Sequence, residues 1–403
     1  MSTVRPLPPQ LEAALQQAMR VHRAGNPVEA EQRYRALLRH APDHAPTNNF
    51  LGIALRDQGK RDEAVAVLRR IASIAPDYAP VQCNLGNVLF EQGLSAEAEA
   101  CYRRALAASP DMTDALRNLG LVLVDQGRFE ESFAPFRRHA ELTYGRRGTP
   151  VPEHKLRHDQ EQREHLVAAG VPGAASGGFR LEEGARVPGP AVSPDRSGGV
   201  VAEQWEKSSP QIVVIDDLLT GEALDALRAY CRRSTVWERA YPNGYLGAMP
   251  EHGFAFPLLA QIAGELRATY PTIFGEHPLL RWWGFTYDSR LRGIDVHADF
   301  AAVNVNFWIT ADEANLDPEH GGLVIWDTPA PAHWTLAEYN SPGAGPAIRE
   351  LLTKSGARSI TVPHRANRAV VFDSDLFHET DRITFREGYA NRRINVTLLY
   401  GRR

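Results

Sequence analysis

The chain has 403 residues, of which 43% are hydrophobic and 23% charged, so it has the composition of a globular protein of two to three domains and not of a disordered, collagen-like or coiled-coil chain. Its net charge of −4 argues against nucleic-acid binding through bulk positive charge, and three scattered cysteines exclude a disulfide framework and favour a reducing, cytoplasmic compartment. No apolar run opens the chain and no stretch of ~18 apolar residues occurs in it, so we expect neither a signal peptide nor a membrane span.

A 34-residue period dominates the first third of the chain. One unit, residues 45–78, shows what it means: apolar residues at helical spacing lead to Gly59, where a helix can end, and a second helix then runs up to Pro76. Such a helix pair cannot bury its apolar face alone, so neighbouring pairs are expected to stack. The period is seen in glycines at 25, 59, 93 and 127, in prolines at 42, 76 and 110, and in Leu-Gly pairs at 51, 85 and 119.

This segment resembles the tetratricopeptide repeat, in four copies over residues 11–146, with a degenerate first copy that has Gln17 and Ala18 in place of Leu-Gly. The resemblance implies an α-helical solenoid with a concave groove for a peptide or protein partner. It would place four polar residues in that groove, although each of them is equally well explained as an ordinary solvated helix residue. These are Asn49, Arg56, Asn87 and Arg117.

Residues 147–210 are rich in proline and glycine and are interpreted as a linker with a short helix at 155–166. Few buried contacts are expected across this stretch. His154, His158 and His165 fall in it, and their spacing is that of a polar helix surface more than that of a metal site.

Residues 211–403 are expected to form a second domain. A β-rich run at 211–215 leads into a helix capped by Thr220, and another helix is expected at 257–270. Short β-type runs separated by turn residues follow, which is typical of an antiparallel sandwich or barrel. An interruption at 334–355 looks partly helical and could cover a site. The runs lie at 282–287, 302–309, 322–326, 359–362, 369–372 and 394–400.

Three features of this β region point to metal chemistry. His297 and Asp299 lie two residues apart, so on an extended strand their side chains point to one side. His378 follows an apolar strand, and Arg393 opens the last strand, where it shares a face with Asn395. Two histidines and one carboxylate form the facial triad of non-haem Fe(II) oxygenases, and a guanidinium suits the second carboxylate of a 2-oxo acid.

In this order, these residues make residues 211–403 resemble the Fe(II)- and 2-oxoglutarate-dependent oxygenases, most closely the prolyl-hydroxylase-like branch. The resemblance implies a double-stranded β-helix, or jelly-roll, with flanking helices, and hence a multidomain α + β chain. His297, Asp299 and His378 match the iron ligands of the family, and Arg393 matches the arginine that holds 2-oxoglutarate. Arg392 is its rival, but strand parity places Arg392 on the apolar face.

Further contacts to the co-substrate are expected from polar residues on neighbouring strands. Tyr287 stands where the family often has such a tyrosine, although a packed core tyrosine explains it equally well. Asn304 and Asn306 share one face of the strand after the ligands, and one of them could contact the co-substrate or the substrate. Asn395 is a further candidate, because it shares the face of Arg393. Three other histidines compete with His378, but none of them leads into a strand that carries an arginine. They are His320, His333 and His364.

The resemblance implies a dioxygenase that uses Fe(II), 2-oxoglutarate and O2, usually to hydroxylate its substrate. A repeat groove tethered to the oxygenase favours a peptide or protein substrate, with no nucleic-acid or membrane partner. Two alternatives remain open: an oxygenase for a small molecule whose repeats dock a partner, and a non-catalytic scaffold that senses iron or 2-oxoglutarate. The sequence does not define the substrate or the oligomeric state.

Overall fold

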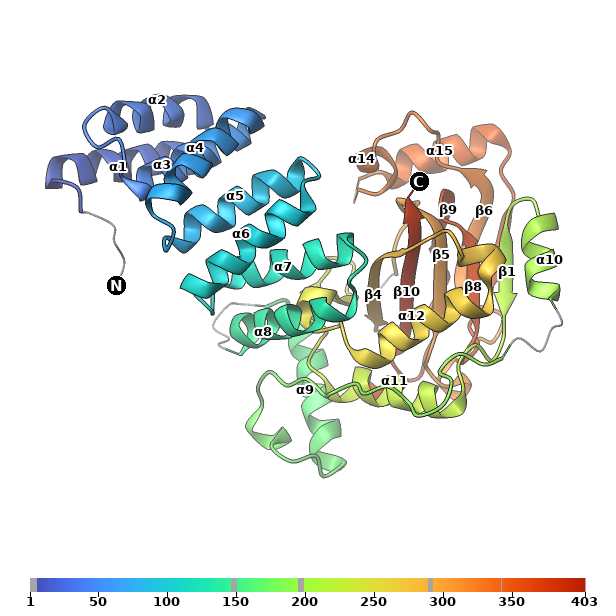
Figure 1. The fold of residues 1–403 in the computed structure, drawn as a ribbon. Helices are drawn as coiled ribbons and strands as arrows, with labels where there is room; N and C mark the ends of the chain where they lie inside the picture. The colour runs from blue at the N-terminus through green and yellow to red at the C-terminus, as the bar shows by residue number, and fades with distance from the viewer. Residues whose placement is uncertain (1–5, 146–150, 195–198, 289–292, 342, 403) are drawn as a thin grey trace. The chain divides into compact units, whose positions relative to one another are not determined.

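The computed structural model describes residues 6–145, 151–194, 199–288, 293–341 and 343–402, and it divides into two compact units (Figure 1). The first unit is Met1–Leu142 and the second is Thr143–Arg403. Within the described segments, no helix combines the length and the apolar character needed to cross a bilayer.

The first unit is an array of helix pairs, as the 34-residue period predicts. Each helix from α1 to α7 packs against the next one along the chain, and one continuous hydrophobic core runs from Leu15 to Leu123. The stacking of helix pairs is therefore confirmed. The helices are α1 (Pro9–Arg23), α2 (Pro27–Leu38), α3 (Ala45–Asp57), α4 (Arg61–Ile74), α5 (Ala79–Glu91), α6 (Ser95–Ala108), α7 (Thr113–Asp125) and α8 (Phe133–Tyr144).

Two kinds of glycine explain why the period is so regular. The glycines between paired helices, such as Gly59 with a φ of 75°, adopt the left-handed conformation that lets the chain turn back. The glycines inside the first helix of a pair allow close approach to the second helix. A Cβ on Gly86 would lie 2.7 Å from the ring of Tyr102, and one on Gly120 would lie 2.4 Å from the ring of Phe136.

The stretch interpreted as a linker belongs to the second unit. Its main element is α9 (Glu153–Ala168), followed by η2 (Ala174–Ser176) and α10 (Val200–Lys207). The face of α9 that is buried carries Lys155, His158, Gln162 and Leu166. Because three of these four residues are polar, apolar periodicity gives no sign of this buried face. The expectations of few buried contacts and of a solvated histidine surface are therefore wrong.

The second unit holds two antiparallel sheets. The larger has the strand order β1-β8-β5-β10-β4-β3-β2, and the smaller has the order β7-β6-β9. Trp308 and Phe372 from the large sheet and Leu323 and Ile325 from the small sheet share one hydrophobic core. The strands are β1 (Ile212–Ile215), β2 (Arg239–Ala240), β3 (Leu246–Ala248), β4 (Leu279–Tyr287), β5 (Ala301–Trp308), β6 (Leu323–Pro329), β7 (Ser359–Val362), β8 (Ala369–Asp373), β9 (Leu376–Thr380) and β10 (Arg393–Arg402).

Helices cover the outer side of the large sheet. α11 (Gly221–Arg233) and α12 (Pro257–Thr269) lie across it (Figure 1), and Tyr400 of β10 donates a hydrogen bond to the carbonyl oxygen of Ala263 in α12. The segment at 334–355 forms α14 (Leu336–Tyr339) and α15 (Gly345–Ser355), in line with its partly helical pattern. Tyr339, Ile348 and Leu352 from these two helices pack with Val296, Ala298 and Phe377.

Candidate metal centre

Three predicted ligands, His297, Asp299 and His378, come together in the second unit. Their potential ligand atoms all lie within 4.8 Å of one another. His297 and Asp299 precede β5 and His378 lies in β9, and the backbones of the two histidines exchange hydrogen bonds of 3.0 and 2.8 Å. The His297 segment is thus held to β9 by a single bridge and not by a full strand, yet both side chains point to one place.

Backbone carbonyls fix how the two imidazole rings are protonated. Nδ1 of His297 lies 2.9 Å from the oxygen of Asp295, and Nδ1 of His378 lies 3.0 Å from the oxygen of Leu376. A carbonyl oxygen can only accept a hydrogen bond, so each Nδ1 carries the proton. In the neutral ring the lone pair is then on Nε2, and a hydrogen bond from Nδ1 to a carbonyl oxygen is the usual support of a metal-binding histidine.

Asp299 is buried and held by two amide side chains. Asn304 donates to its Oδ2 at 2.7 Å and Asn340 donates to its Oδ1 at 3.1 Å. Burial alone would raise the pKa of this carboxyl, but interactions with His378 and His297 outweigh burial and hold the pKa below its ordinary value. Burial, and then the electrostatic interaction with His378, lower the pKa of His297 to about 4. The carboxylate and the His297 imidazole are therefore in the protonation states that bind a metal ion.

A chain of buried hydrogen bonds runs from Asp299 to Arg393 along the inner faces of β5 and β10. After Asn304, Asn306 donates to Asn304 at 3.0 Å and Asn395 donates to Asn306 at 2.9 Å. Nη1 of Arg393 then donates to Oδ1 of Asn395 at 3.1 Å. The candidate residues Asn304 and Asn395 are therefore both part of one network.

Arg393 is almost wholly buried and has only neutral partners. Besides Asn395, it donates to the carbonyl oxygens of Gly321 and Gly322. Its guanidinium carbon lies 4.6 Å from the centre of the Tyr287 ring and 5.8 Å from that of Trp308. No carboxylate within the described ranges lies at ion-pair distance from it. Burial lowers the pKa of Arg393 below its ordinary value, as expected for a desolvated cation.

Arg392 points the other way. Its Nε lies 3.0 Å from Glu161 and its Nη2 lies 3.7 Å from Asp288. The two arginines thus occupy opposite sides of the backbone, as strand parity requires, and Arg393 is the one on the side of the asparagines.

The competing histidines lie apart from this cluster: His320 pairs with Asp381 at 3.0 Å, and His364 is buried beside Phe385. Asn340 was missed by sequence reasoning, although the segment that carries it was singled out. Nothing in a lone asparagine after a short helix predicts a contact to Asp299.

Two of the candidate groove residues, Asn49 and Asn87, accept hydrogen bonds from asparagines of the next repeat. Asn84 donates to Asn49 at 2.9 Å and Asn118 donates to Asn87 at 2.7 Å, so the first helices of successive repeats are joined. Arg117 is exposed, as a solvated groove residue would be.

Comparisons with known proteins concern the repeats. A MamA structure from Desulfovibrio magneticus RS-1 is 20% identical, covers 42% of this chain and 92% of that chain, and has a TM-score of 0.31. A structure of MamA AMB-1 is 26% identical, covers 33% of this chain and 72% of that chain, and has a TM-score of 0.29. No curated protein matches the chain. Residues 43–111 and residues 83–145 each match a tetratricopeptide repeat family, so the N-terminal region consists of tetratricopeptide repeats.

Proposed function

We propose that the second unit is an Fe(II)- and 2-oxoglutarate-dependent oxygenase that hydroxylates a peptide or protein recruited by the repeats. The observation that carries the proposal is the hydrogen-bonded line from Asp299 to Arg393. At one end lies a candidate metal site of three residues. At the other lies the buried guanidinium of Arg393, which has no carboxylate at ion-pair distance among the described residues. A 2-oxo dicarboxylic acid needs one group of each kind.

The donor set fits Fe(II). Two imidazoles with free Nε2 atoms and one carboxylate suit a facial triad with open positions, and His297, His378 and Asp299 would hold the ion. Fe(II), when bound, would supply dioxygen activation coupled to oxidative decarboxylation of the 2-oxo acid. Asn304 and Asn340 would keep the carboxylate oriented, so that little of it has to reorganise on binding.

The surroundings of Arg393 fit the distal carboxylate of 2-oxoglutarate. A buried guanidinium with no anionic partner is costly, and a carboxylate bound through two parallel contacts would offset that cost. The indole Nε1 of Trp308 is also buried, with no hydrogen-bond partner among the described residues, and its ring lies 5.8 Å from the guanidinium carbon. Two antiparallel sheets that share one core further support the jelly-roll fold expected for such an oxygenase.

The repeats favour a peptide or protein as the substrate. Stacked helix pairs offer an extended surface, and a tether to the oxygenase would raise the local concentration of whatever they bind. Because the repeats and the second unit each have a core of their own, recruitment and chemistry can be separated by mutation.

The test is turnover by the full chain supplied with Fe(II), 2-oxoglutarate and a lysate of its host. We expect succinate formation that the lysate stimulates and peptides that gain one oxygen atom. Asp299→Ala should abolish both and Arg393→Ala should reduce both, whereas His333→Ala, in an exposed loop, should change neither. Stimulation by small metabolites alone would favour the small-molecule oxygenase, and binding without turnover would favour the sensing scaffold. The proposal would be overturned if the chain failed to bind iron or failed to bind 2-oxoglutarate.

A further inference from the structure

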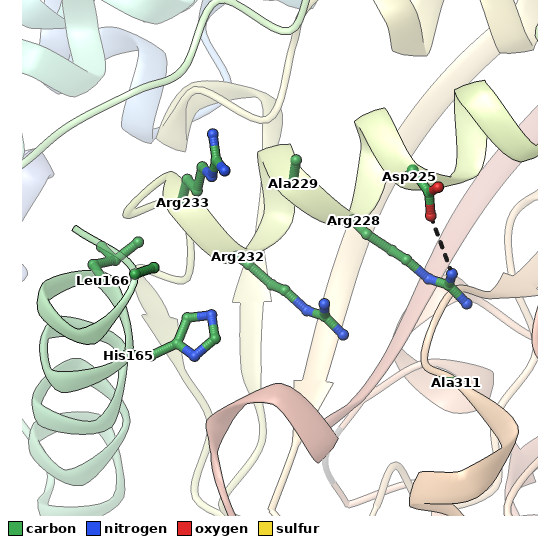
Figure 2. Close-up of a pocket in the computed structure, with 9 residues that line it drawn as sticks. His165, Leu166, Asp225, Arg228, Ala229, Arg232, Arg233 and Ala311 are labelled. Carbon is green, nitrogen blue, oxygen red and sulfur yellow. Dashed lines mark hydrogen bonds and ion pairs between the residues drawn. The ribbon is translucent and has the colours of Figure 1, made fainter. Parts of the chain in front are cut away.

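A second polar site lies in the same unit, in a cavity of about 310 Å³ between α9, α11 and the loop after β5 (Figure 2). Three arginines of α11 line it, Arg228, Arg232 and Arg233, together with His165 of α9. Asp225 is the one carboxylate in the lining. The lining therefore carries three guanidinium groups against one carboxylate.

This cavity is separate from the candidate metal centre. Asp299 lies just before β5 and Ala311, which lines the cavity, lies just after it. The eight residues of β5, at about 3.3 Å each, place the two ends roughly 25 Å apart. A ligand in the cavity is thus not the proposed co-substrate, and the inference does not depend on the oxygenase proposal.

The positive charge of the cavity is only partly balanced. Asp225 is highly exposed and lies 3.4 Å from Arg228, whose Nε also donates to the carbonyl oxygen of Ile309. Arg232 donates to the carbonyl oxygen of Ala390, and it has no acidic partner in the described part of the chain. Burial, and then repulsion from Arg228, lower the pKa of Arg232 below its ordinary value. An anion between the two arginines would relieve that repulsion.

Two of the arginine side chains lie on one side of α11, where His165 also lies. In Figure 2, Arg228 and Arg232 extend to the same side of α11, and the ring of His165 faces Arg232 from α9. The ring of His165 is also supported by that of Tyr389, 5.2 Å away. Arg233 extends in the opposite direction. Two guanidinium groups and one imidazole thus approach from two helices.

We propose that this cavity binds the phosphate group of a small phosphate ester. Phosphate offers three acceptor oxygens in a tetrahedral arrangement, which suits donors that arrive from several side chains, and arginine forks match its geometry. A volume of about 310 Å³ is in the range of small-molecule sites and exceeds what a lone phosphate fills. Leu166, Ala169 and Ala229 provide apolar surface for the rest of the ligand.

The test measures binding of inorganic phosphate and of glycerol 3-phosphate to the full chain, by calorimetry and by thermal unfolding at constant ionic strength. We expect saturable binding of both and a rise in unfolding temperature with ligand concentration. Arg232→Gln should weaken binding by roughly ten- to a hundredfold, since it removes a charge-assisted contact. Arg163→Gln is the matched control, because Arg163 is exposed on α9 and lies outside the lining, and it should leave binding unchanged.

A second variant protects the test against misfolding. Ala229→Glu removes no hydrogen bond, and it places a carboxylate among the arginines, so it should block phosphate binding and raise stability without ligand. Undetectable binding of both probes would overturn the proposal. Equal weakening by Arg232→Gln and Arg163→Gln would also overturn it, because it would show diffuse attraction to surface charge.

Discussion

Asn304 donates a hydrogen bond of 2.7 Å to Asp299, and its own carbonyl oxygen accepts one of 3.0 Å from Asn306. The amide is thus fixed at both ends, so the orientation of Asp299 is set by the protein. The same amide begins the line of hydrogen bonds that reaches Arg393 through Asn395. The two ends of the candidate site are therefore positioned by one network.

Asn304→Ala should weaken metal binding by about ten- to a hundredfold, as is typical when the support of a metal ligand is lost. Titration with Co(II), followed by its visible absorption, would measure the change. Val305→Ala is the control, because Val305 is the next residue on β5 and points to the other face. Unchanged metal affinity in a folded Asn304→Ala protein would contradict the prediction.

Alanine substitutions at the neighbouring Arg393 and Arg392 should affect different properties of the protein. Arg393→Ala should weaken 2-oxoglutarate binding by roughly ten- to a hundredfold and leave metal binding nearly unchanged, because its contacts are remote from the triad. Arg392→Ala removes the arginine that pairs with Glu161 and one of the two arginines beside Asp288, so it should instead lower the free energy of unfolding by about 1–3 kcal/mol. Urea unfolding and 2-oxoglutarate titration of both variants separate the two effects. A large loss of 2-oxoglutarate affinity in Arg392→Ala alone would reverse the assignment.

The sequence predicts the structure correctly where a regular pattern is present, either the repeat period or the alternation of side chains along a strand. The 34-residue period predicts the helix pairs because each repeat has to solve the same packing problem, seen in Gly86 against Tyr102. Parity separates Arg393, the first residue of β10, from Arg392 just before it, since neighbouring residues of an extended backbone face opposite sides.

Sequence reasoning fails where polar residues do the packing. The buried face of α9 carries Lys155, His158 and Gln162, which look like surface residues until their partners are known. Asn340 lies 41 positions after Asp299 in the sequence, so no local pattern predicts the contact between them. The cavity lined by arginines could not be predicted from the sequence either. Arginines in the last turn of α11 are also explained by the helix dipole, which favours cations there.

Close helix packing in the repeats gives a stability prediction. Gly86→Ala places a methyl group 2.7 Å from the ring of Tyr102, which is fully buried and hydrogen-bonded to Asn87. The ring cannot retreat, so we expect a loss of about 1–3 kcal/mol in the free energy of unfolding, measured by far-UV circular dichroism in urea. Gly264→Ala, exposed in α12 with nothing near its Cβ, should gain about 0.5–1 kcal/mol.

The repeats should also lose stability in acid through Glu31. Burial alone would raise the pKa of this carboxyl, but hydrogen bonds from Lys60, Arg35 and Gln58 lower it to about 2. A carboxyl whose pKa is lower in the folded state stabilises the protein above its unfolded pKa of 4.5 and loses that effect as the pH falls toward 2. We expect about 2 kcal/mol at neutral pH, after allowance for partly exposed partners.

Glu31→Gln should therefore flatten the dependence of unfolding free energy on pH between about 5 and 2. Glu29→Gln is the control, because Glu29 pairs with Arg33 on the exposed side of the same helix, where an ion pair contributes little. Equal pH profiles for the wild type and Glu31→Gln would show that the buried pairing contributes nothing.

The packing of α9 decides where the second unit can be cut. Gln162 donates to the carbonyl oxygens of Arg232 and Ser234, and His158 packs beside Trp237 and Tyr389. Further along, the backbone at 187–192 is hydrogen-bonded to α12. A fragment of residues 151–403 keeps all of these contacts, whereas a fragment of residues 203–403 loses them and exposes the surface beneath.

We therefore expect residues 151–403 to unfold cooperatively and residues 203–403 to lose fixed tertiary packing, seen as a lost near-UV circular dichroism signal. The longer fragment should turn over 2-oxoglutarate slowly but lose activity on a protein substrate, since the tether no longer concentrates that substrate. Full activity of this fragment on the native substrate would show that the repeats do not recruit it. Equal unfolding temperatures for the two fragments would show that α9 adds nothing to the fold, despite its buried face.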